Sequence, residues 1–312
     1  MTPSLMEFFS AGPSPVQRLH HPLLARSKVD LFIKRDDLLH PLVSGNKWRK
    51  LKHNLLQARQ QGCQRLLSFG GAYSNHIHAL AHAGRLLGFD TIGVIRGGPF
   101  AEPSPTLRQA AACGMHLHHV SRQDYRRRDD ARFLRCLAQR FGDFQLLPEG
   151  GSNTLALRGC AELVRELDQQ LDHYHAVCLP CGTGGTLAGV AAALAPDRRA
   201  LGFAVLKGAG FLQRQVAALQ RSAGLQGDYE LLLDYHFGGY ARADDRLREF
   251  IARWRPLPLD PVYTAKMMYG VIDLIDKGAF APGSRIVVVH TGGLQGAGEE
   301  AGDIAAEVHI EF

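Results

Sequence analysis

The sequence lacks any uninterrupted apolar run of the ~18 residues that a membrane-spanning helix needs. Its first segment, MTPSLMEFFSAGPSPVQRL, lacks the charged start and the continuous apolar core of a secretory signal peptide. These two absences argue against a membrane protein and against a secreted one. We therefore expect a cytoplasmic protein that has no membrane partner.

Cysteine is also scarce. Six cysteines dispersed over 312 residues do not make a disulfide scaffold. The closest pair, Cys178 and Cys181, has the spacing of a redox or metal motif, but no second CxxC pair accompanies it. The sequence therefore predicts two small buried residues at a strand end, and no metal site.

The charge balance is basic, with a net charge of +6 and a pI near 9.1. Such a balance suits an anionic cofactor or substrate, and it could also suit nucleic acid. The densest cluster, Arg126-Arg127-Arg128, is followed at once by Asp129-Asp130, which is typical of a mixed, solvated helix face. No basic stripe interleaved with aromatic residues is present, so we expect a small anionic ligand and no nucleic-acid partner.

Short apolar runs alternate with amphipathic stretches along the chain, which predicts an α/β fold of open, mostly parallel, twisted sheets flanked by helices. The expected strands are Val29–Lys34, Arg65–Phe69, Thr91–Ile95, His116–Val120, Ala176–Leu179, Arg199–Val205 and Arg285–His290. The expected helices are Lys47–Gln61, Asn75–Leu87, Ser104–Cys113, Asp129–Phe141, Thr154–Gln170, Thr186–Leu194, Phe211–Ser222, Arg246–Trp254 and Thr264–Lys277.

The chain is longer than one comfortable core, which favours two domains. We expect a larger, cofactor-binding domain made of residues 1–49 and 151–312, and a smaller domain made of residues 50–150. Leu146–Asn153 is predicted to be a loop that crosses between them.

Lys47 is the most informative single residue, because it follows the small, flexible turn Ser44-Gly45-Asn46 at the start of an expected helix. An ordinary lysine is an ammonium ion with a pKa near ~10.4 and is a poor nucleophile. Burial or neighbouring cations lower that pKa, and the free amine can then form a Schiff base with a carbonyl. Arg49 and Lys50 supply cations here. By itself, the pattern also fits a solvated lysine.

Three loops are expected at strand ends, where open α/β sheets bind ligands. In Phe69–His76, two glycines let the backbone approach a ligand, and Ser74 or Asn75 caps the next helix, whose N–H groups suit an anion. A plain helix cap explains this loop equally well. In Pro180–Thr186, a glycine-rich turn before a helix suits a phosphate, although a tight turn without a ligand also fits. This turn has neither the dinucleotide nor the triphosphate motif.

The third loop, Val289–Gly293, places the neutral hydroxyl of Thr291 at a crevice-facing position. Tyr263 stands at the start of the expected helix Thr264–Lys277. A purely structural role would also explain this tyrosine, because a buried tyrosine needs only one hydrogen-bond partner. One amine, one phosphate-sized loop and several hydroxyls together suggest pyridoxal phosphate as the cofactor.

Five segments agree, in order, with one known family: IKRDDLLHPLVSGNKWRKL, FGGAYSNHIHALAHAG, CGTGGTLAG, LDPVYTAK and VVVHTGG. Through them the chain resembles the pyridoxal-phosphate-dependent family that contains D-cysteine desulfhydrase and 1-aminocyclopropane-1-carboxylate (ACC) deaminase, with the tryptophan-synthase-β-like fold. The resemblance runs from about Phe32 to Gly293. It implies a homodimeric lyase that acts on a small amino acid.

The resemblance also implies roles for individual residues. Lys47 would carry the cofactor as a Schiff base, and Lys50 would help to hold its phosphate. The remaining phosphate contacts would come from Gly182, Thr183, Gly184, Gly185 and Thr186. Asn75 would bind the ring 3-hydroxyl oxygen, and Thr291 would meet the pyridine nitrogen.

On the substrate side, the resemblance implies contacts from Ser74, Asn75 and His76. Tyr240 and Tyr263 match the catalytic tyrosines of the family. The α-proton would be removed by Lys47, or by a relay through Ser74 and Tyr263, before the β-substituent leaves and hydrolysis gives a 2-oxo acid and ammonia.

Three positions separate the two activities. ACC deaminases have Gln, Glu and Leu where this chain has His76, Thr264 and Thr291. A carboxylate near the pyridine nitrogen makes the ring a strong electron sink, which opening a cyclopropane demands. A threonine hydroxyl gives a milder sink, which suffices to expel a thiolate whose conjugate acid has a pKa near ~8.5. We therefore expect D-cysteine to yield pyruvate, sulfide and ammonia.

Two alternatives stay open at this point. One is an ACC deaminase or an eliminase for another small amino acid, and the other is a non-catalytic ligand-binding protein, against which the retention of Lys47 argues. The chain also departs from the family after Gly293, where LQGAGEEAGDIAAEVHIEF replaces the usual Ala-Pro-Ala-Leu continuation.

Overall fold

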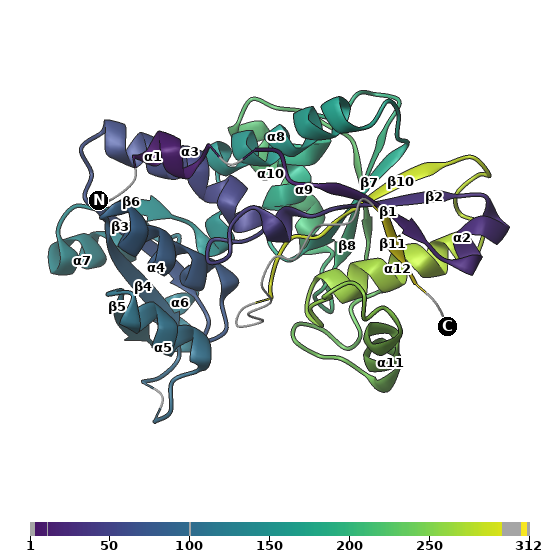
Figure 1. The fold of residues 1–312 in the computed structure, drawn as a ribbon. Coiled ribbons are helices and arrows are strands. Elements are labelled where there is room, and N and C mark those ends of the chain that lie inside the picture. Colours follow the sequence, from purple (N-terminus) through teal and green to yellow (C-terminus); the bar gives the residue numbers. More distant parts are fainter. Residues whose placement is uncertain (1–3, 11, 100, 295–306, 311–312) are drawn as a thin grey trace.

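The computed structural model describes residues 4–10, 12–99, 101–294 and 307–310, and it contains two sheets that lie side by side (Figure 1). Most of the divergent C-terminal segment, residues 295–306 and 311–312, lies outside the described residues. The larger sheet has the strand order β11 (Glu307–His309), β1 (Val16–His20), β2 (Asp30–Lys34), β10 (Arg285–Val289), β7 (Ala176–Cys181), β8 (Arg199–Ala204), β9 (Tyr229–Leu232).

The smaller sheet has the order β5 (His116–Val120), β4 (Asp90–Arg96), β3 (Arg65–Gly70), β6 (Gln145–Leu147). All of its strands are parallel, and in the larger sheet the pair β1 and β2 is antiparallel while the others are parallel. The expected α/β architecture with mostly parallel sheets is confirmed. The four strands of the smaller sheet lie inside the predicted smaller domain, whose boundaries stay a prediction.

Helices cover both faces of each sheet. They are α1 (Leu5–Phe8), α2 (Pro22–Ser27), α3 (Asn46–Gln60), α4 (Asn75–Leu87), α5 (Pro105–Ala112), α6 (Arg122–Tyr125), α7 (Ala131–Phe141), α8 (Thr154–Gln170), α9 (Gly185–Ala191), α10 (Phe211–Ser222), α11 (Asp245–Arg253) and α12 (Thr264–Asp276), with 3₁₀ turns η1 (Asp36–Leu38) and η2 (Glu149–Gly151). Core residues of α2, α11 and α12 pack on one face of the larger sheet, and those of α8, α9 and α10 on the other. Strand β7 is therefore buried along its whole length, as its continuous apolar run requires.

The expected strands and helices are all present, and each boundary agrees within three residues. Several short elements were not expected, among them β1, β9 and β11 in the larger sheet. The prediction of a loop at Leu146–Asn153 was wrong in part, because Leu146 and Leu147 belong to β6 and pair with β3. Strands of three to five residues with a half-buried pattern offer too little periodicity to be recognised.

Helix α3 is the element that joins the two halves. Its apolar residues Trp48, Leu51 and Leu55 belong to a core on the smaller sheet. Its other side lies against α8, where a Cβ atom on Gly159 would be 1.9 Å from the carbonyl oxygen of Arg49. Only a glycine permits this approach, so α3 is packed directly between the two lobes.

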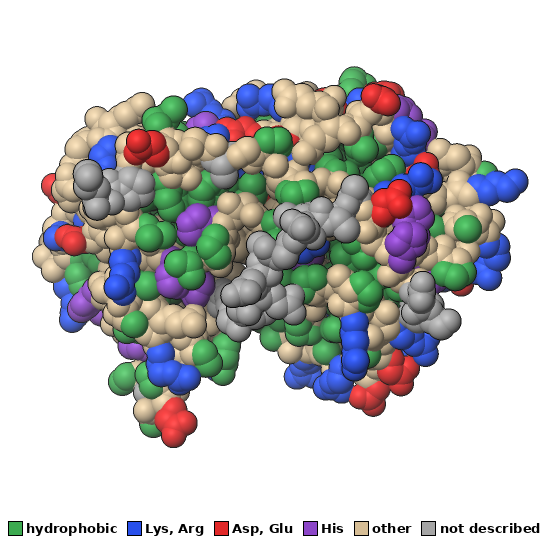
Figure 2. All heavy atoms as spheres, viewed as in Figure 1, with side chains coloured by type: hydrophobic (Ala, Val, Ile, Leu, Met, Phe, Trp, Pro, Cys, Tyr) green, Lys and Arg blue, Asp and Glu red, His purple; other side chains and the backbone are tan. Residues whose placement is uncertain are grey.

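Charged side chains of both signs are mixed on the face drawn in Figure 2, where Lys and Arg lie among Asp and Glu. Among the described residues, no helix is long and apolar enough to cross a membrane. Cys178 and Cys181 are both buried in β7, as predicted, and neither forms a disulfide.

Candidate active site

A cavity of about 430 Å³ opens where the carboxyl ends of β3, β7 and β10 approach one another. Ligand sites of open α/β sheets occur at such strand ends. The thirteen residues predicted for the site all line it: Lys47, Lys50, Ser74, Asn75, His76, Gly182, Thr183, Gly184, Gly185, Thr186, Tyr240, Tyr263 and Thr291. Four loops and the starts of α3 and α12, far apart in the sequence, therefore meet around one space.

Lys47 lies in the first turn of α3, whose N-cap is Gly45. Gly45 has φ +65°, and a Cβ atom there would be 2.0 Å from the carbonyl oxygen of Thr291, so this turn needs glycine. The Nζ atom of Lys47 donates to Asn46 Oδ1 at 2.8 Å. Burial around the cavity, and then the charge of Lys50, lower the pKa of Lys47 to about 7. A large fraction of this amine is therefore neutral near pH 7 and can act as a nucleophile.

Lys50 stands one turn further along the same face of α3. Its Nζ atom donates to Gly150 O at 3.1 Å and to Ser152 Oγ at 2.9 Å. Burial lowers its pKa. A Cβ atom on Gly185 would lie only 3.1 Å from Nζ, so the amine sits against the glycine-rich loop. Lys50 is thus placed to attract an anion held by that loop.

Arg49 does not play the part expected of it. Its guanidinium points away from the cavity and binds Asp36 and Glu166, with Nε–Oδ2 and Nη1–Oε1 distances of 2.6 and 2.7 Å. Those carboxylates neutralise its charge, so Lys50 is the cation that acts on Lys47. The expectation that Arg49 lowers the pKa of Lys47 was wrong, because residues adjacent in a helix point in different directions.

The glycine-rich loop ends in Gly184, the N-cap of α9, which has φ +73° and no side-chain capping bond. The first N–H groups of α9 therefore lack a cap and lie at the positive end of the helix dipole. Around the loop, Ser152 Oγ lies 2.7 Å from Thr183 Oγ1, and Asn46 Nδ2 donates to Thr186 Oγ1 at 3.0 Å. This arrangement suits a phosphate dianion.

On the opposite side, Ser74 caps α4 by accepting a hydrogen bond from Ile77 N at 3.3 Å. The plain helix-cap explanation is therefore correct for Ser74, although its side chain also lines the cavity. His76 is buried next to it, with Nε2 2.9 Å from Ser68 Oγ. Burial and the charges of Lys47 and Lys50 lower the pKa of His76 well below its usual range. His76 is therefore neutral.

His76 Nδ1 is buried and has no hydrogen-bond partner among the described residues. A buried polar atom without a partner is costly. Since His76 lines the cavity, a ligand there could satisfy this nitrogen.

Two tyrosines close the cavity on the side of α12. Their rings are 6.1 Å apart and meet edge to face. Burial, and then the neighbouring Tyr240, raise the pKa of Tyr263 well above its usual range. Tyr240 is 43% exposed, and it lies on a segment whose carbonyl groups His236 O and Gly239 O accept hydrogen bonds from the buried Lys266 Nζ at 2.9 and 2.7 Å.

The two threonines that were expected to tune a ring are placed differently. Thr291 lines the cavity at the end of β10. Thr264 is fully buried, is not among the lining residues, and donates from Oγ1 to Asp260 Oδ2 at 2.6 Å. Its hydroxyl thus serves the start of α12, which the expectation from the sequence did not foresee.

Sequence reasoning missed a charged group on the wall of the smaller lobe. Arg96, Arg128 and Glu149 line the cavity, and Arg128 Nε lies 3.0 Å from Glu149 Oε2. Arg128 was expected on a solvated helix face, which was wrong because the chain turns after α6 and brings it inward. Arg96 ends β4, and a charged residue at a strand end was a usable signal.

Comparison with known proteins gives a consistent result. The family model described as "Pyridoxal-phosphate dependent enzyme" matches residues 8–292. A putative ACC deaminase of Thermotoga maritima is 30% identical over 305 residues, which cover 92% of this chain and 96% of the relative. A mitochondrial bifunctional D-cysteine desulfhydrase/ACC deaminase of Arabidopsis thaliana is 28% identical, with 94% of this chain and 79% of the relative covered.

Among solved structures, one described as an ACC deaminase homologue superposes with a TM-score of 0.80. It is 27% identical, and the match covers 95% of this chain and 96% of the other.

Proposed function

The chain belongs to the ACC deaminase/D-cysteine desulfhydrase family of pyridoxal-phosphate-dependent enzymes, and on this premise we propose that it converts D-cysteine and water to pyruvate, hydrogen sulfide and ammonia. The observation that carries the proposal is a lysine amine with a pKa of about 7 beside an uncapped glycine-rich helix start in one cavity. The cofactor, when bound, withdraws electrons from the α-carbon of the substrate.

The cavity residues fit this cofactor. Lys47 Nζ would hold it covalently, and Lys50 with the loop Gly182–Thr186 would bind its phosphate. Gly185 has no room for a side chain, since a Cβ atom would be 2.4 Å from Ser152 Oγ, so the backbone itself faces the anion. Asn75 and Thr291 would contact the ring from the two remaining loops.

Residues that line the cavity would carry out the proton transfers. Lys47 Nζ would take the α-proton, because its pKa of about 7 suits a general base near pH 7. The high pKa of Tyr263 keeps its hydroxyl protonated, so it would donate a hydrogen bond to the leaving sulfur. Ser74 and the neutral His76 would orient the substrate carboxylate beside the start of α4.

The choice of D-cysteine over ACC now depends on Thr291 and His76. Thr291 supplies a neutral hydroxyl, which suits the milder electron sink that thiolate expulsion needs. Thr264 supports this choice only indirectly, since its hydroxyl is engaged by Asp260. ACC deamination is the second candidate, because several relatives at 28–30% identity are described as putative ACC deaminases.

A product assay separates the candidates. The cofactor-loaded protein is given D-cysteine, L-cysteine, D-serine, β-chloro-D-alanine or ACC, and the 2-oxo acid is identified. We expect pyruvate and sulfide from D-cysteine and no 2-oxobutyrate from ACC. The reverse pattern would establish the ACC deaminase instead, and no product from any substrate would favour a non-catalytic protein.

Three further proposals concern the assembly, the location and the domain boundaries of the chain. We propose a homodimer in the cytoplasm, with a larger domain of residues 1–49 and 151–312 and a smaller domain of residues 50–150. Light scattering coupled to size-exclusion chromatography would measure the mass, for which twice 34.2 kDa is expected.

A further inference from the structure

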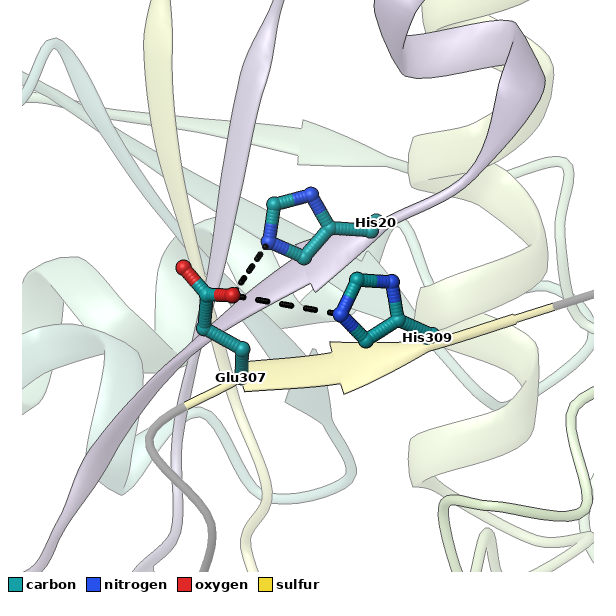
Figure 3. Close-up of side chains that lie close together, drawn as sticks. All are labelled: His20, Glu307 and His309. Carbon is teal, nitrogen blue, oxygen red and sulfur yellow. Dashed lines mark ion pairs between the residues drawn. The ribbon is translucent and has the colours of Figure 1, made fainter.

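A second group of convergent side chains lies at the edge of the larger sheet, where β11 pairs with β1 (Figure 3). The register of β1 and β11 places Leu19 beside Val308 and His20 beside His309. Leu19 and Val308 pack into the core, so alternation along both strands turns His20, Glu307 and His309 to the outer face. The group shares no residue with the cavity of the candidate active site.

The three side chains point at one another. His20 Nε2 and His309 Nε2 lie 3.4 and 3.9 Å from the same oxygen, Glu307 Oε2. The two imidazole rings are stacked, with centroids 4.5 Å apart and planes 12° from parallel. Within the described part of the chain, no other three His, Cys, Asp or Glu side chains converge in this way.

These distances are too long for hydrogen bonds, which span about 2.7–3.2 Å for N–H···O. His20 Nε2 is in fact buried and makes no hydrogen bond to any described residue. The Nε2–Oε2 distances of 3.4 and 3.9 Å do suit ligands that share one ion. Zinc binds imidazole nitrogen and carboxylate oxygen at ~2.0–2.2 Å, so two ligands of a tetrahedral ion are about 3.3 Å apart. To bind one ion, the two rings would turn out of their stacked arrangement, so that both Nε2 lone pairs face the ion.

We propose that His20, Glu307 and His309 bind a divalent transition-metal ion of the zinc type, with water completing the coordination. A set of two imidazoles and one carboxylate binds such ions in preference to magnesium, which favours oxygen ligands. The ion joins β11 to β1, to which backbone pairing already ties it through a hydrogen bond from Ile310 N to His20 O at 2.9 Å. The bound ion therefore fastens the C-terminal strand to the sheet.

The experiment uses the cofactor-loaded protein after treatment with a chelator. Titration calorimetry with Zn²⁺ is expected to give one ion per chain, and Mg²⁺ is expected to give no binding. His309→Ala is expected to lose this ion, and the isosteric Glu307→Gln is expected to weaken it at least about tenfold, since even outer-shell partners of a metal are worth that much. His116→Ala, an exposed histidine on β5 of the other sheet, serves as the matched control and is expected to bind normally.

A second readout follows the strand itself. At a Zn²⁺ concentration that just saturates the wild-type protein, the ion is expected to slow hydrogen exchange of the Ile310 amide there, and to slow it less in Glu307→Gln, a change too small to unfold the chain. The proposal fails if the wild-type protein binds no Zn²⁺. It fails equally if His309→Ala and Glu307→Gln bind the ion as the wild-type protein does. Neither outcome bears on the proposed lyase activity.

Discussion

Two walls of the cavity are held in very different ways. The lysine wall, Lys47 and Lys50 on α3, stands on a buried charge network in which Arg49 bridges Asp36 and Glu166. Lys34 joins the same network through Glu166 at 2.7 Å. Charges buried together and fully hydrogen-bonded resist separation, because parting them leaves an uncompensated charge.

The tyrosine wall, Tyr240 and Tyr263, has a lighter support. The segment around Tyr240 is tied by hydrogen bonds from one amine, Lys266 Nζ, to two carbonyl groups. Phe237 and Ala241 on either side have φ values of 51° and 54°, which non-glycine residues rarely adopt. The difference is that the wall proposed to hold the cofactor rests on buried ion pairs, while the wall proposed to meet the substrate rests on separate hydrogen bonds and ring packing. In that second wall Tyr263 N donates to Asp260 Oδ1 at 2.8 Å, and Lys266 Nζ ties the segment of Tyr240.

Lys47→Ala gives the largest expected effect. Loss of the amine removes both the attachment point and the general base, and the latter alone is worth about 10²–10⁴ in rate. We expect 2-oxo acid formation from D-cysteine to become undetectable in a coupled assay. The matched control is Lys52→Ala on the same helix, whose amine pairs with Glu162 at 2.8 Å outside the cavity, and it is expected to keep its activity. Activity in Lys47→Ala would refute the role of the lysine wall.

Arg49→Met tests the support of the lysine wall. Asp36 is fully buried, so removing its guanidinium partner leaves an unpaired charge and is expected to cost about 3–5 kcal/mol of unfolding free energy. Urea unfolding followed by circular dichroism measures this cost. Arg26→Met, at the exposed pair with Asp276, is the control and is expected to change little. Equal unfolding free energies of Arg49→Met and Arg26→Met would contradict the claim that the buried charge network supports the lysine wall.

Lys266→Met tests the anchor of the tyrosine wall. Two carbonyl groups lose their donor, and a shift of the Tyr240 segment is expected to lower kcat/KM by about ten- to a hundredfold. Cofactor absorbance is expected to be unchanged, because the lysine wall is intact. Lys277→Met, an exposed residue directly after the same helix, is the control. Loss of the cofactor band along with activity would show that the two walls are not independent.

The pH dependence of cofactor loading gives the smallest expected effect. Only the neutral amine of Lys47 attacks a carbonyl, so the loading rate is expected to rise as pH increases towards about 7 and then to level off. An ordinary lysine would continue to gain up to pH ~10.4. Stopped-flow absorbance from pH 5.5 to 9 compares the two, with Nα-acetyl-lysine amide, in which only the side-chain amine is free, as the parallel reaction. A rate that keeps rising like that of the free amide would mean that burial does not activate Lys47.

The loops that line the cavity could be predicted from the sequence because each is a local strand–turn–helix pattern, and parallel sheets bring such ends together. Lys47, Ser74 and the Gly182–Thr186 loop were found in this way. The supports of the walls could not be predicted. Arg49 meets Glu166 from 117 positions away, and Lys266 meets the Tyr240 segment from 27 and 30 positions away.

Orientation was the second limit. Arg49 and Lys50 are neighbours in the sequence, yet the helix turns one to a salt-bridge network and the other to the cavity. Thr264 follows Tyr263 in the same way, but its hydroxyl binds Asp260. Arg128 shared a basic run with two exposed arginines, and only the fold brought it to the cavity. A motif predicts which residues are near a site, while the direction of each side chain depends on packing.

The attachment point of the cofactor tests the central claim most directly. Protein loaded with pyridoxal phosphate is reduced with borohydride, digested, and analysed by peptide mass spectrometry. We predict a single adduct, on Lys47, because its amine combines exposure to the cavity with a pKa of about 7. An adduct on Lys50, or no adduct at all, would contradict the account.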